Sequence, residues 1–221
     1  MIIAIDGPAG SGKSTIAKTI AEKLAFRYIN SGAMYRAVAW TAQNKEIDLN
    51  NEDEVARVAE KLEIEFVSNP QGQKVTVDGQ DATQALKTES VGAGAAIVAG
   101  QPRIREIMTA RQRQMGRKGK VVMEGRDIGT VVFPQADLKF YFDADPEERG
   151  KRRYLELKAK QRPVNLKNIV AQIKQRDYED AHRKIAPLAR ADDAIYVDTT
   201  HLNIEAVVDR VVERIGPAAN V

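Results

Sequence analysis

The sequence predicts an α/β protein with a central parallel sheet and helices on both faces. Short apolar runs at 1–5, 120–123 and 138–142 alternate with segments whose apolar residues recur at helical spacing. The first run leads directly into a glycine-rich loop and then into a helix over 13–24. Strands that alternate with helices in this way form βαβ units, which pair their strands in parallel.

The glycine-rich loop at 7–14 reads Gly-Pro-Ala-Gly-Ser-Gly-Lys-Ser and matches G-x-x-x-x-G-K-[ST]. Its three glycines allow tight turns that direct backbone amides at phosphate oxygens. Lys13 is expected to reach the β- and γ-phosphates and Ser14 to bind Mg²⁺, while the following helix adds its positive end. The alternative is a glycine-rich turn in an ordinary βα unit, which the lysine and the flanking elements disfavour. We predict a nucleoside triphosphate site formed by Gly7, Pro8, Ala9, Gly10, Ser11, Gly12, Lys13 and Ser14.

Composition excludes several other functions. The chain has 221 residues, 43% of them hydrophobic and 29% charged, as in a globular protein with one full core. It has no cysteine, which excludes disulfides and thiolate catalysis, and only His182 and His201 as histidines. No apolar run reaches the roughly 20 residues of a membrane helix, and no secretory leader is visible. We therefore expect a cytoplasmic protein, and the net charge of +3 does not by itself indicate nucleic-acid binding.

The first half of the chain contains an interruption of the α/β pattern. A short strand near 28–29 leads into a helix to about residue 43, with Ser31 as its N-cap, and another helix is expected over 50–62. Between 60 and 87, two β segments flank a turn at 70–72, and Asp78-Gly79 marks a second turn. We interpret this region as an insertion. A place in the central sheet is the alternative, although its polar composition argues against burial on both faces.

The α/β pattern resumes in the second half. Pro102 occupies the first turn of a helix, where its missing amide hydrogen is tolerated. The expected helices and strands are helices at 89–99, 102–115, 147–161, 166–183 and 204–215 and strands at 120–123, 138–142 and 194–197.

The helix over 166–183 has one face that changes from apolar to charged. Along this face the residues are Leu166, Ile169 and Ile173, then Arg176, Asp180 and Arg183. Charges on an inward stripe suit a helix that leaves the core and continues over an anion-filled cleft. The alternative is a surface helix with an exposed Arg–Asp pair.

Two other charged segments have competing interpretations. Arg126 and Asp127 follow a buried strand at its carboxyl end, where open α/β sheets bind ligands. Arg126 could bind a phosphate and Asp127 a base, a sugar or the water shell of a metal; a solvated ion pair is the alternative. The basic cluster at 147–153 is either a solvated helix face or an arginine-bearing flap that closes over the triphosphate.

Together these segments resemble bacterial cytidylate kinases over essentially the whole chain. The resemblance is carried by the phosphate loop and by three segments: 31–36 (SGAMYR), 125–134 (GRDIGTVVFP) and 176–183, which begins RDYED. The phosphate loop is common to many NTPases, whereas 125–134 is far more restrictive. The resemblance implies a P-loop kinase fold in a single kinase unit. Its core is 1–30, 88–145 and 166–221, its monophosphate-binding region is 31–87 with the β insertion at 60–87, and its helical lid is 146–165.

The resemblance also implies a set of site residues. Those that bind the substrate CMP or dCMP are Ser31, Arg36, Arg105, Arg126, Asp127, Arg176, Asp180 and Arg183. Of these, three read the base (Ser31, Arg126, Asp127), two hold the acceptor phosphate (Arg36, Arg105), two engage the ribose (Arg176, Asp180) and Arg183 faces the phosphates. The lid arginines Arg152 and Arg153 neutralise the donor ATP. The catalytic set is Lys13, Arg126, Asp127 and Arg183.

Three positions depart from the family pattern. Asn30 stands where the family usually has Asp before Ser-Gly, which puts a metal-water role there in doubt. Ala95-Ala96 lack a hydroxyl that the family often directs at cytosine, and Lys87 stands where Arg is expected. These departures could loosen the discrimination between bases.

The expected reaction is transfer of the γ-phosphoryl group of Mg-ATP to CMP or dCMP by a monomer that binds neither nucleic acid nor membrane. The acceptor is already an anion, so alignment and charge neutralisation suffice and no strong base is needed. A P-loop kinase for another acceptor, such as UMP, AMP or a carboxylated metabolite, is the first alternative. A nucleotide-dependent nucleic-acid-binding module is the second, disfavoured by dispersed arginines and 5% aromatic residues.

Overall fold

The computed structural model describes residues 1–69, 72–159, 161 and 163–216. The chain divides into two compact units. The first consists of Met1–Tyr28 and Gly119–Val221, and the second of Ile29–Lys118. In the described part of the chain no helix is long and apolar enough to cross a membrane.

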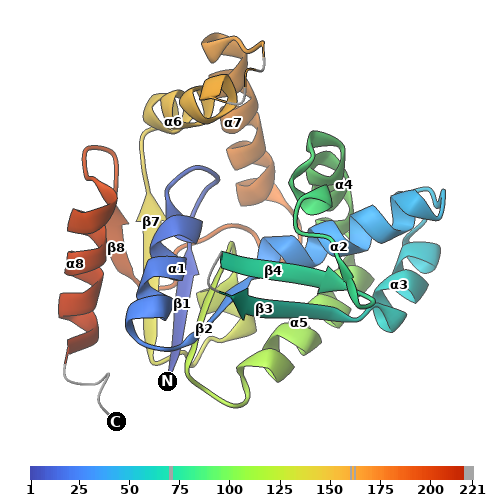
Figure 1. Cartoon of the computed structure of the whole chain (residues 1–221), viewed down its shortest axis with the longest axis horizontal. Coiled ribbons are helices and arrows are strands. Elements are labelled where there is room, and N and C mark those ends of the chain that lie inside the picture. Colours follow the sequence, from blue (N-terminus) through green and yellow to red (C-terminus); the bar gives the residue numbers. More distant parts are fainter. Residues whose placement is uncertain (70–71, 160, 162, 217–221) are drawn as a thin grey trace. The chain divides into compact units, whose positions relative to one another are not determined.

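A five-stranded sheet forms the centre of the first unit (Figure 1). Its order is β2 (Arg27–Asn30), β6 (Val121–Gly125), β1 (Ile2–Asp6), β7 (Leu138–Asp143) and β8 (Ile195–Asp198). β1 pairs in parallel with both β6 and β7, and β7 pairs in parallel with β8. The predicted α/β class with a central parallel sheet is therefore confirmed. The chain passes from the first unit into the second along β2.

Two helices pack on one face of this sheet, against every second side chain of its strands. Helices α1 (Lys13–Lys23) and α8 (Ile204–Ile215) pack on this face (Figure 1). Their apolar side chains join those of the strands in one cluster, which includes Ile3, Ile5, Phe140 and Phe142 from the sheet and Ile16, Ile20, Val208 and Val211 from the helices. All eight are at most 2% exposed, as expected for a face buried by helices.

Three further elements of the first unit lie at the carboxyl end of the sheet. A π-helical turn, η2 (Ile128–Val132), follows β6 and was not anticipated from the sequence. Helices α6 (Pro146–Ala159) and α7 (Leu166–His182) follow β7 and pack against each other. They approach closely at Gly150, where an added Cβ would lie 2.4 Å from Cγ2 of Val170. Residues 160 and 162, in the predicted break between these helices, are outside the described residues.

In its described residues, 29–69 and 72–118, the second unit contains four α-helices and a separate antiparallel sheet. The helices are α2 (Ser31–Asn44), α3 (Glu52–Lys61), α4 (Glu89–Ala99) and α5 (Pro102–Gly116), with a 3-10 turn η1 (Ala85–Lys87). The sheet comprises β3 (Ile64–Asn69), β4 (Gly72–Val77) and β5 (Gln80–Asp81). The predicted β insertion is thus confirmed, and a place for these strands in the central sheet is wrong. Residues 70–71 of the predicted turn lie outside the described residues.

Small residues let the helices of the second unit pack closely. Ala37, Val38 and Ala39 on α2 are fully buried in a cluster shared by α3, α4 and α5. Gly94 on α4 faces Ala39 and Leu49, and an added Cβ would lie 2.8 Å from a methyl carbon of Leu49. Its low helix propensity is therefore offset by a close helix–helix contact.

Two sequence-based boundaries differ from the structure. Asn30, not Ser31, is the N-cap of α2, because its side-chain oxygen accepts a hydrogen bond from Ala33 N at 3.0 Å. Asn and Ser are about equally good caps, so the sequence did not separate them. The second compact unit, Ile29–Lys118, includes 88–118, whereas the family resemblance implied that 88–118 belongs to the kinase core. The functional division into core, monophosphate-binding region and lid stays a prediction.

Candidate active site

The phosphate loop joins β1 to α1 and has the backbone that its glycines permit. Gly7, Gly10 and Gly12 have φ angles of 143°, 78° and 87°. At Gly7 an added Cβ would lie 1.9 Å from the carbonyl oxygen of Phe142, so no side chain fits there. The loop therefore rests directly on the end of β7, with α1 beginning at Lys13.

Lys13 is folded back over this loop. Its Nζ donates to the carbonyl oxygen of Pro8 at 2.6 Å and to Oγ of Ser11 at 3.4 Å. Burial, together with the positive charge of Arg126, lowers the pKa of Lys13 to about 7 against the attraction of Glu124 and Asp6. A buried cation with so few acceptors is well suited to bind an anion, which would raise its pKa.

Asp6, the last residue of β1, connects the phosphate loop strand to the segment after β6. Its two carboxylate oxygens accept hydrogen bonds from the amides of Ile128 at 2.8 Å and Gly129 at 2.7 Å. Burial raises its pKa to about 6, although these hydrogen bonds oppose the shift. Sequence reasoning missed Asp6; a carboxylate that ends an otherwise apolar strand was the available signal.

Two ion pairs join α7 and its C-terminal end to the residues after β6. Nε of Arg126 donates to Oδ2 of Asp180 at 2.8 Å, with both side chains about one-fifth exposed. Nη2 of Arg183 lies 3.7 Å from Oδ1 of Asp127, which is buried. These are not the solvated surface pairs of the alternative interpretation, because Asp180 and Arg183 of the predicted charged stripe point inward, toward the residues that follow β6.

The electrostatics of this cluster are dominated by arginines. Burial opposes ionisation of Asp180, but the charge and hydrogen bond of Arg126, with Arg176 and Arg183, lower its pKa. Burial, together with the charge of Arg126, lowers the pKa of Arg176. Arginines held this close together repel one another, and a bound anion relieves that repulsion while it is stabilised by each of them.

The two predicted lid arginines, Arg152 and Arg153, differ from each other in their contacts. Arg152 donates to the carbonyl oxygens of Thr199 and Thr200, and Arg153 forms a pair with Glu156 at 3.1 Å while remaining 43% exposed. Thr199 in turn donates from Oγ1 to the carbonyl oxygen of Ser11 at 3.0 Å, so Arg152 touches the loop through an intermediary. The arginine that contacts the loop directly is Arg149, which sequence reasoning did not single out.

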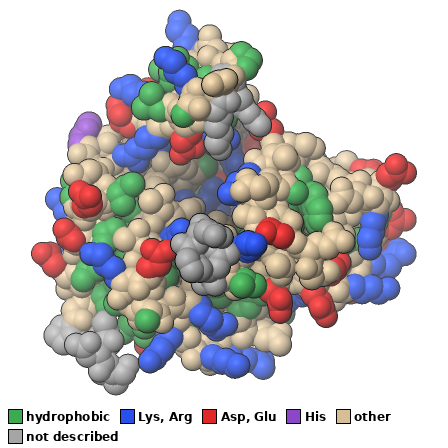
Figure 2. Space-filling model, in the orientation of Figure 1, with side chains coloured by type: hydrophobic (Ala, Val, Ile, Leu, Met, Phe, Trp, Pro, Cys, Tyr) green, Lys and Arg blue, Asp and Glu red, His purple; other side chains and the backbone are tan. Residues whose placement is uncertain are grey.

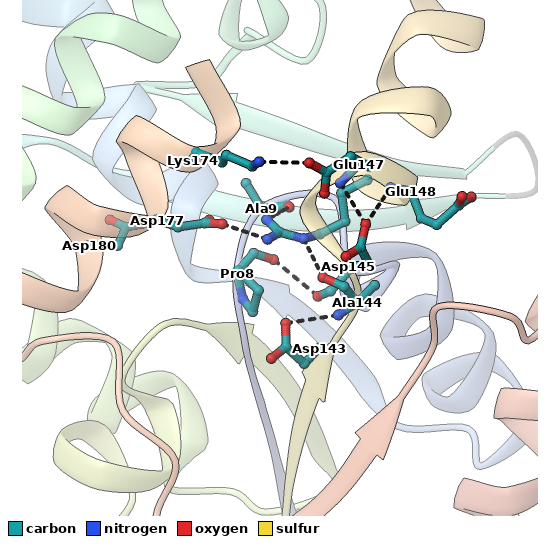
Figure 3. Close-up of polar contacts among 12 residues, drawn as sticks. Pro8, Ala9, Asp143, Ala144, Asp145, Glu147, Glu148, Lys174, Asp177 and Asp180 are labelled. Carbon is teal, nitrogen blue, oxygen red and sulfur yellow. Dashed lines mark hydrogen bonds and ion pairs between the residues drawn. The ribbon is translucent and has the colours of Figure 1, made fainter. Parts of the chain in front are cut away.

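Figure 3 shows the polar contacts around this part of the loop. Ala9 of the loop, Ala144 at the end of β7 and Asp177 on α7 lie around a common centre, and a Lys174–Glu147 pair lies beyond them. The signal for Arg149 was weak because it lies inside a run of charged residues that resembles any solvated helix face.

The second unit contains the other three predicted substrate residues. Ser31 is the buried first residue of α2, and Arg36 is half-buried on the same helix. Arg105 on α5 is 4% exposed, donates from Nη1 to the carbonyl oxygen of Ala99 at 3.2 Å, and lies 5.5 Å from the ring centre of Tyr35. A buried guanidinium stacked on an aromatic ring is preorganised to bind an anion.

The structure shows the local environment of each of the three departures from the family pattern. Asn30 caps α2, a role that Asn and Asp perform equally well. Ala95 is buried and Ala96 exposed on α4, and Lys87 is exposed at the end of η1. Their effect on base discrimination stays a prediction.

A magnesium ion fits the residues around the phosphate loop. Ser14 is exposed in the first turn of α1 and presents a hydroxyl, a hard oxygen ligand. Among the described residues no group of three or more His, Cys, Asp or Glu is arranged to hold a metal. A single protein hydroxyl suits Mg²⁺, which keeps several of its waters and is also bound by the phosphates of the substrate.

The fold and the loop define a class of protein, the P-loop kinases, with a phosphate loop after the first strand of a parallel sheet and arginine pairs at its carboxyl edge. Residues 3–216 match the family model for cytidylate kinases, so the chain belongs to the cytidylate kinase family. The cytidylate kinase of Geobacter sulfurreducens is 47% identical over 95% of this chain and 90% of its own length. That of Bacillus subtilis is 45% identical over 96% and 95%.

Solved structures support the fold alone. An uncharacterised protein from Eubacterium ventriosum superposes with a TM-score of 0.53 at 12% identity, covering 98% of this chain and 99% of that one. The identity is too low to carry an activity across, so the family assignment rests on the sequence relatives.

Proposed function

We propose that the protein transfers the γ-phosphoryl group of ATP to CMP or dCMP, giving CDP or dCDP and ADP. The observation that carries this proposal is the family match over residues 3–216. The loop geometry and the Arg126–Asp180 pair supply groups that a phosphoryl transfer between two anions requires. Location in the cytoplasm and a monomeric state remain predictions from the sequence.

On the donor side, the backbone amides of the phosphate loop hold the triphosphate. Lys13 exchanges the carbonyl oxygen of Pro8 for the β- and γ-phosphates, whose negative charge raises its pKa. Ser14 holds Mg²⁺, which neutralises developing charge on the phosphates when it is bound. Arg152 and Arg153 close from α6, a movement that needs their present contacts to be released.

On the acceptor side, Arg36 and Arg105 hold the phosphate of CMP and Ser31, Arg126 and Asp127 contact the base. Arg176 and Asp180 bind the ribose, and Arg183 faces the phosphates. Because the acceptor oxygen is already ionised, these residues only align it and neutralise charge. Neither histidine is needed: His182 lies exposed beside Tyr178, and His201 is exposed after β8.

The nucleic-acid-binding alternative has little support. On the face in Figure 2, Asp and Glu side chains are interspersed among the Lys and Arg side chains. A basic surface is the expected footprint of a protein that binds nucleic acid through phosphates.

The test is ADP formation from Mg-ATP with CMP, dCMP, UMP, AMP, GMP and TMP offered separately. Strong turnover with CMP and dCMP and weak turnover with UMP is the expected result. Equal turnover of UMP and CMP would keep the kinase and locate the loss of discrimination at Ala95-Ala96. Absence of turnover with every acceptor, although ATP still binds, would contradict the proposal.

A further inference from the structure

Arg149 is a buried guanidinium that bonds to three separate elements of the first unit. It lies in the first turn of α6 and is 2% exposed. Nε donates to the carbonyl oxygen of Ala144 at 2.8 Å, Nη1 to that of Ala9 at 3.0 Å, and Nη2 to Oδ2 of Asp177 at 2.6 Å. Figure 3 shows these three acceptors converging from the end of β7, the phosphate loop and α7.

The contact with the phosphate loop includes its backbone as well as one hydrogen bond. Gly10 has a φ of 78°, and a Cβ added there would lie 3.2 Å from Cβ of Arg149. The turn Ala9-Gly10 therefore rests on the first turn of α6. That turn is itself fixed, because Oδ1 of Asp145 caps it by accepting from Glu147 N at 2.8 Å.

The contact with α7 connects this turn to the opposite side of the cluster. Asp177 lies one helical turn before Asp180, which binds Arg126. Oδ1 of Asp177 is buried without a hydrogen-bond partner among the described residues. The contact of this carboxylate with Arg149 is made by its other oxygen, Oδ2. Helix α7 thus carries one ion pair to the α6 arginine that supports the phosphate loop and another to the segment after β6.

We propose that Arg149 is a positioning residue that sets the Ala9-Gly10 turn of the phosphate loop for the donor nucleotide. Each of its three nitrogens bonds to the protein, so the residue acts through the loop and not on the phosphates. A planar fork is required because three acceptors lie in different directions, and a lysine ammonium on a flexible stem does not reproduce it. The proposal rests on the proposed function for the identity of the nucleotide as ATP.

The proposal is tested with Arg149→Lys, which keeps the charge opposite Asp177 and loses the fork. The expected result is that the Kd and KM for Mg-ATP rise about 10- to 100-fold, since small misplacements of binding groups cost this much. The KM for CMP and the kcat at saturating ATP should stay within about threefold of wild type, because the acceptor contacts and the transferred group are not touched.

The matched control is Lys174→Gln. The Lys174–Glu147 pair joins the same two helices at 2.6 Å, but both side chains are about half exposed and neither bonds to the loop. This variant should leave both KM values within about twofold of wild type, as exposed pairs contribute little. Asp177→Asn is measured alongside; it keeps an acceptor for Arg149 and should raise the Kd for ATP by a smaller factor in the same direction.

Three results would overturn the proposal. One is a Kd for ATP within twofold of wild type in both Arg149→Lys and Asp177→Asn. Another is an equal rise in the KM values for ATP and CMP, which is the pattern of a general loss of structure. The third is a fall in kcat with an unchanged Kd for ATP, which would make Arg149 a catalytic residue. Direct ATP titration keeps this test separate from the proposed function, whose failure would appear as absent CMP turnover in the wild-type enzyme.

Discussion

The two units of the chain differ in how many charged side chains they bury. Among the described residues, every buried charged side chain except Arg105 belongs to the first unit. There Asp6 and Lys13 have strongly displaced pKa values. In the second unit the core is mainly alanine and valine, and the groups with a shifted pKa, Asp48 and Asp81 among them, lie on the surface.

Most of the charged residues of the candidate site therefore lie in the first unit. Burying a charged group costs several kcal/mol unless the group is paired. A unit that buries several charged groups is therefore less stable than one with an apolar core, and such groups are typical of functional sites. The alanine-rich second unit instead presents a few residues, such as Arg105 over Tyr35, from a conventionally packed helical core. Substitutions at matched positions in the two units should therefore have very different effects.

The largest expected effect is on catalysis by the first unit. Lys13→Ala should lower kcat/KM for ATP about a thousandfold, since one charge-stabilising donor is typically worth 10²–10³ or more. Steady-state kinetics measures this, with Lys61→Ala on the surface of α3 as the control from the second unit. Near-normal activity of Lys13→Ala would show that Lys13 does not bind the donor nucleotide.

A pair of glycines compares the backbones of the two units. Gly7→Ala should lower the free energy of unfolding by about 3 to 5 kcal/mol, because its Cβ would overlap the Phe142 carbonyl at an unfavourable φ. Gly79→Ala, in the turn between β4 and β5, should cost only about 1 kcal/mol because φ is +78° but no atom lies within 4 Å. Urea denaturation measures both, and equal losses would contradict the difference between the two turns.

The buried carboxylate of Asp6 predicts a pH dependence of stability. A carboxyl whose folded pKa is raised from 3.8 to about 6 binds its proton more tightly in the folded state. The free energy of unfolding should therefore fall by about 3 kcal/mol in total as pH rises from about 3 to 7, at 1.4 kcal/mol per pKa unit, with about 2 kcal/mol of this fall between pH 4 and 6. Asp6→Asn should lack this component. Identical pH profiles for wild type and Asp6→Asn between pH 4 and 6 would refute it.

The smallest effect is expected at the surface of the second unit. Arg103 pairs with Asp53 at 3.0 Å and Glu60 at 2.8 Å, but these side chains are 45% or more exposed. Arg103→Ala should shift the thermal midpoint by no more than about 2 °C, because exposed pairs are screened and cost side-chain entropy. A larger shift in calorimetry would mean that the second unit also depends on its charges.

Local patterns in the sequence predicted most of the fold. The strand before the phosphate loop, Pro102 at the start of α5 and the Asp78-Gly79 turn each follow from the chemistry of a few adjacent residues. The exceptions were choices between near-equivalent residues, such as Asn30 over Ser31 as a cap. The π-helical turn after Asp127 was also missed, because it depends on the carboxylate of Asp6 more than 120 residues away.

The site was predicted less completely for the same reason. The charged stripe on α7 correctly indicated an inward face, which the Arg126–Asp180 pair bears out. Arg149 and Arg153 look alike in the sequence, yet one is buried against the loop and the other pairs with Glu156 in solvent. Only the packing of α6 on α7 and on the loop distinguishes them, and no local signal encodes that packing.

The proposed reaction is tested by following the γ-phosphoryl group from ATP to its product. Wild-type protein is mixed with Mg-ATP labelled in the γ-phosphate and with CMP, and the products are separated. We expect the label to appear in the β-phosphate of CDP, with one ADP formed per CDP. Label that appears only in orthophosphate, or that stays in ATP although ATP binds, would contradict it.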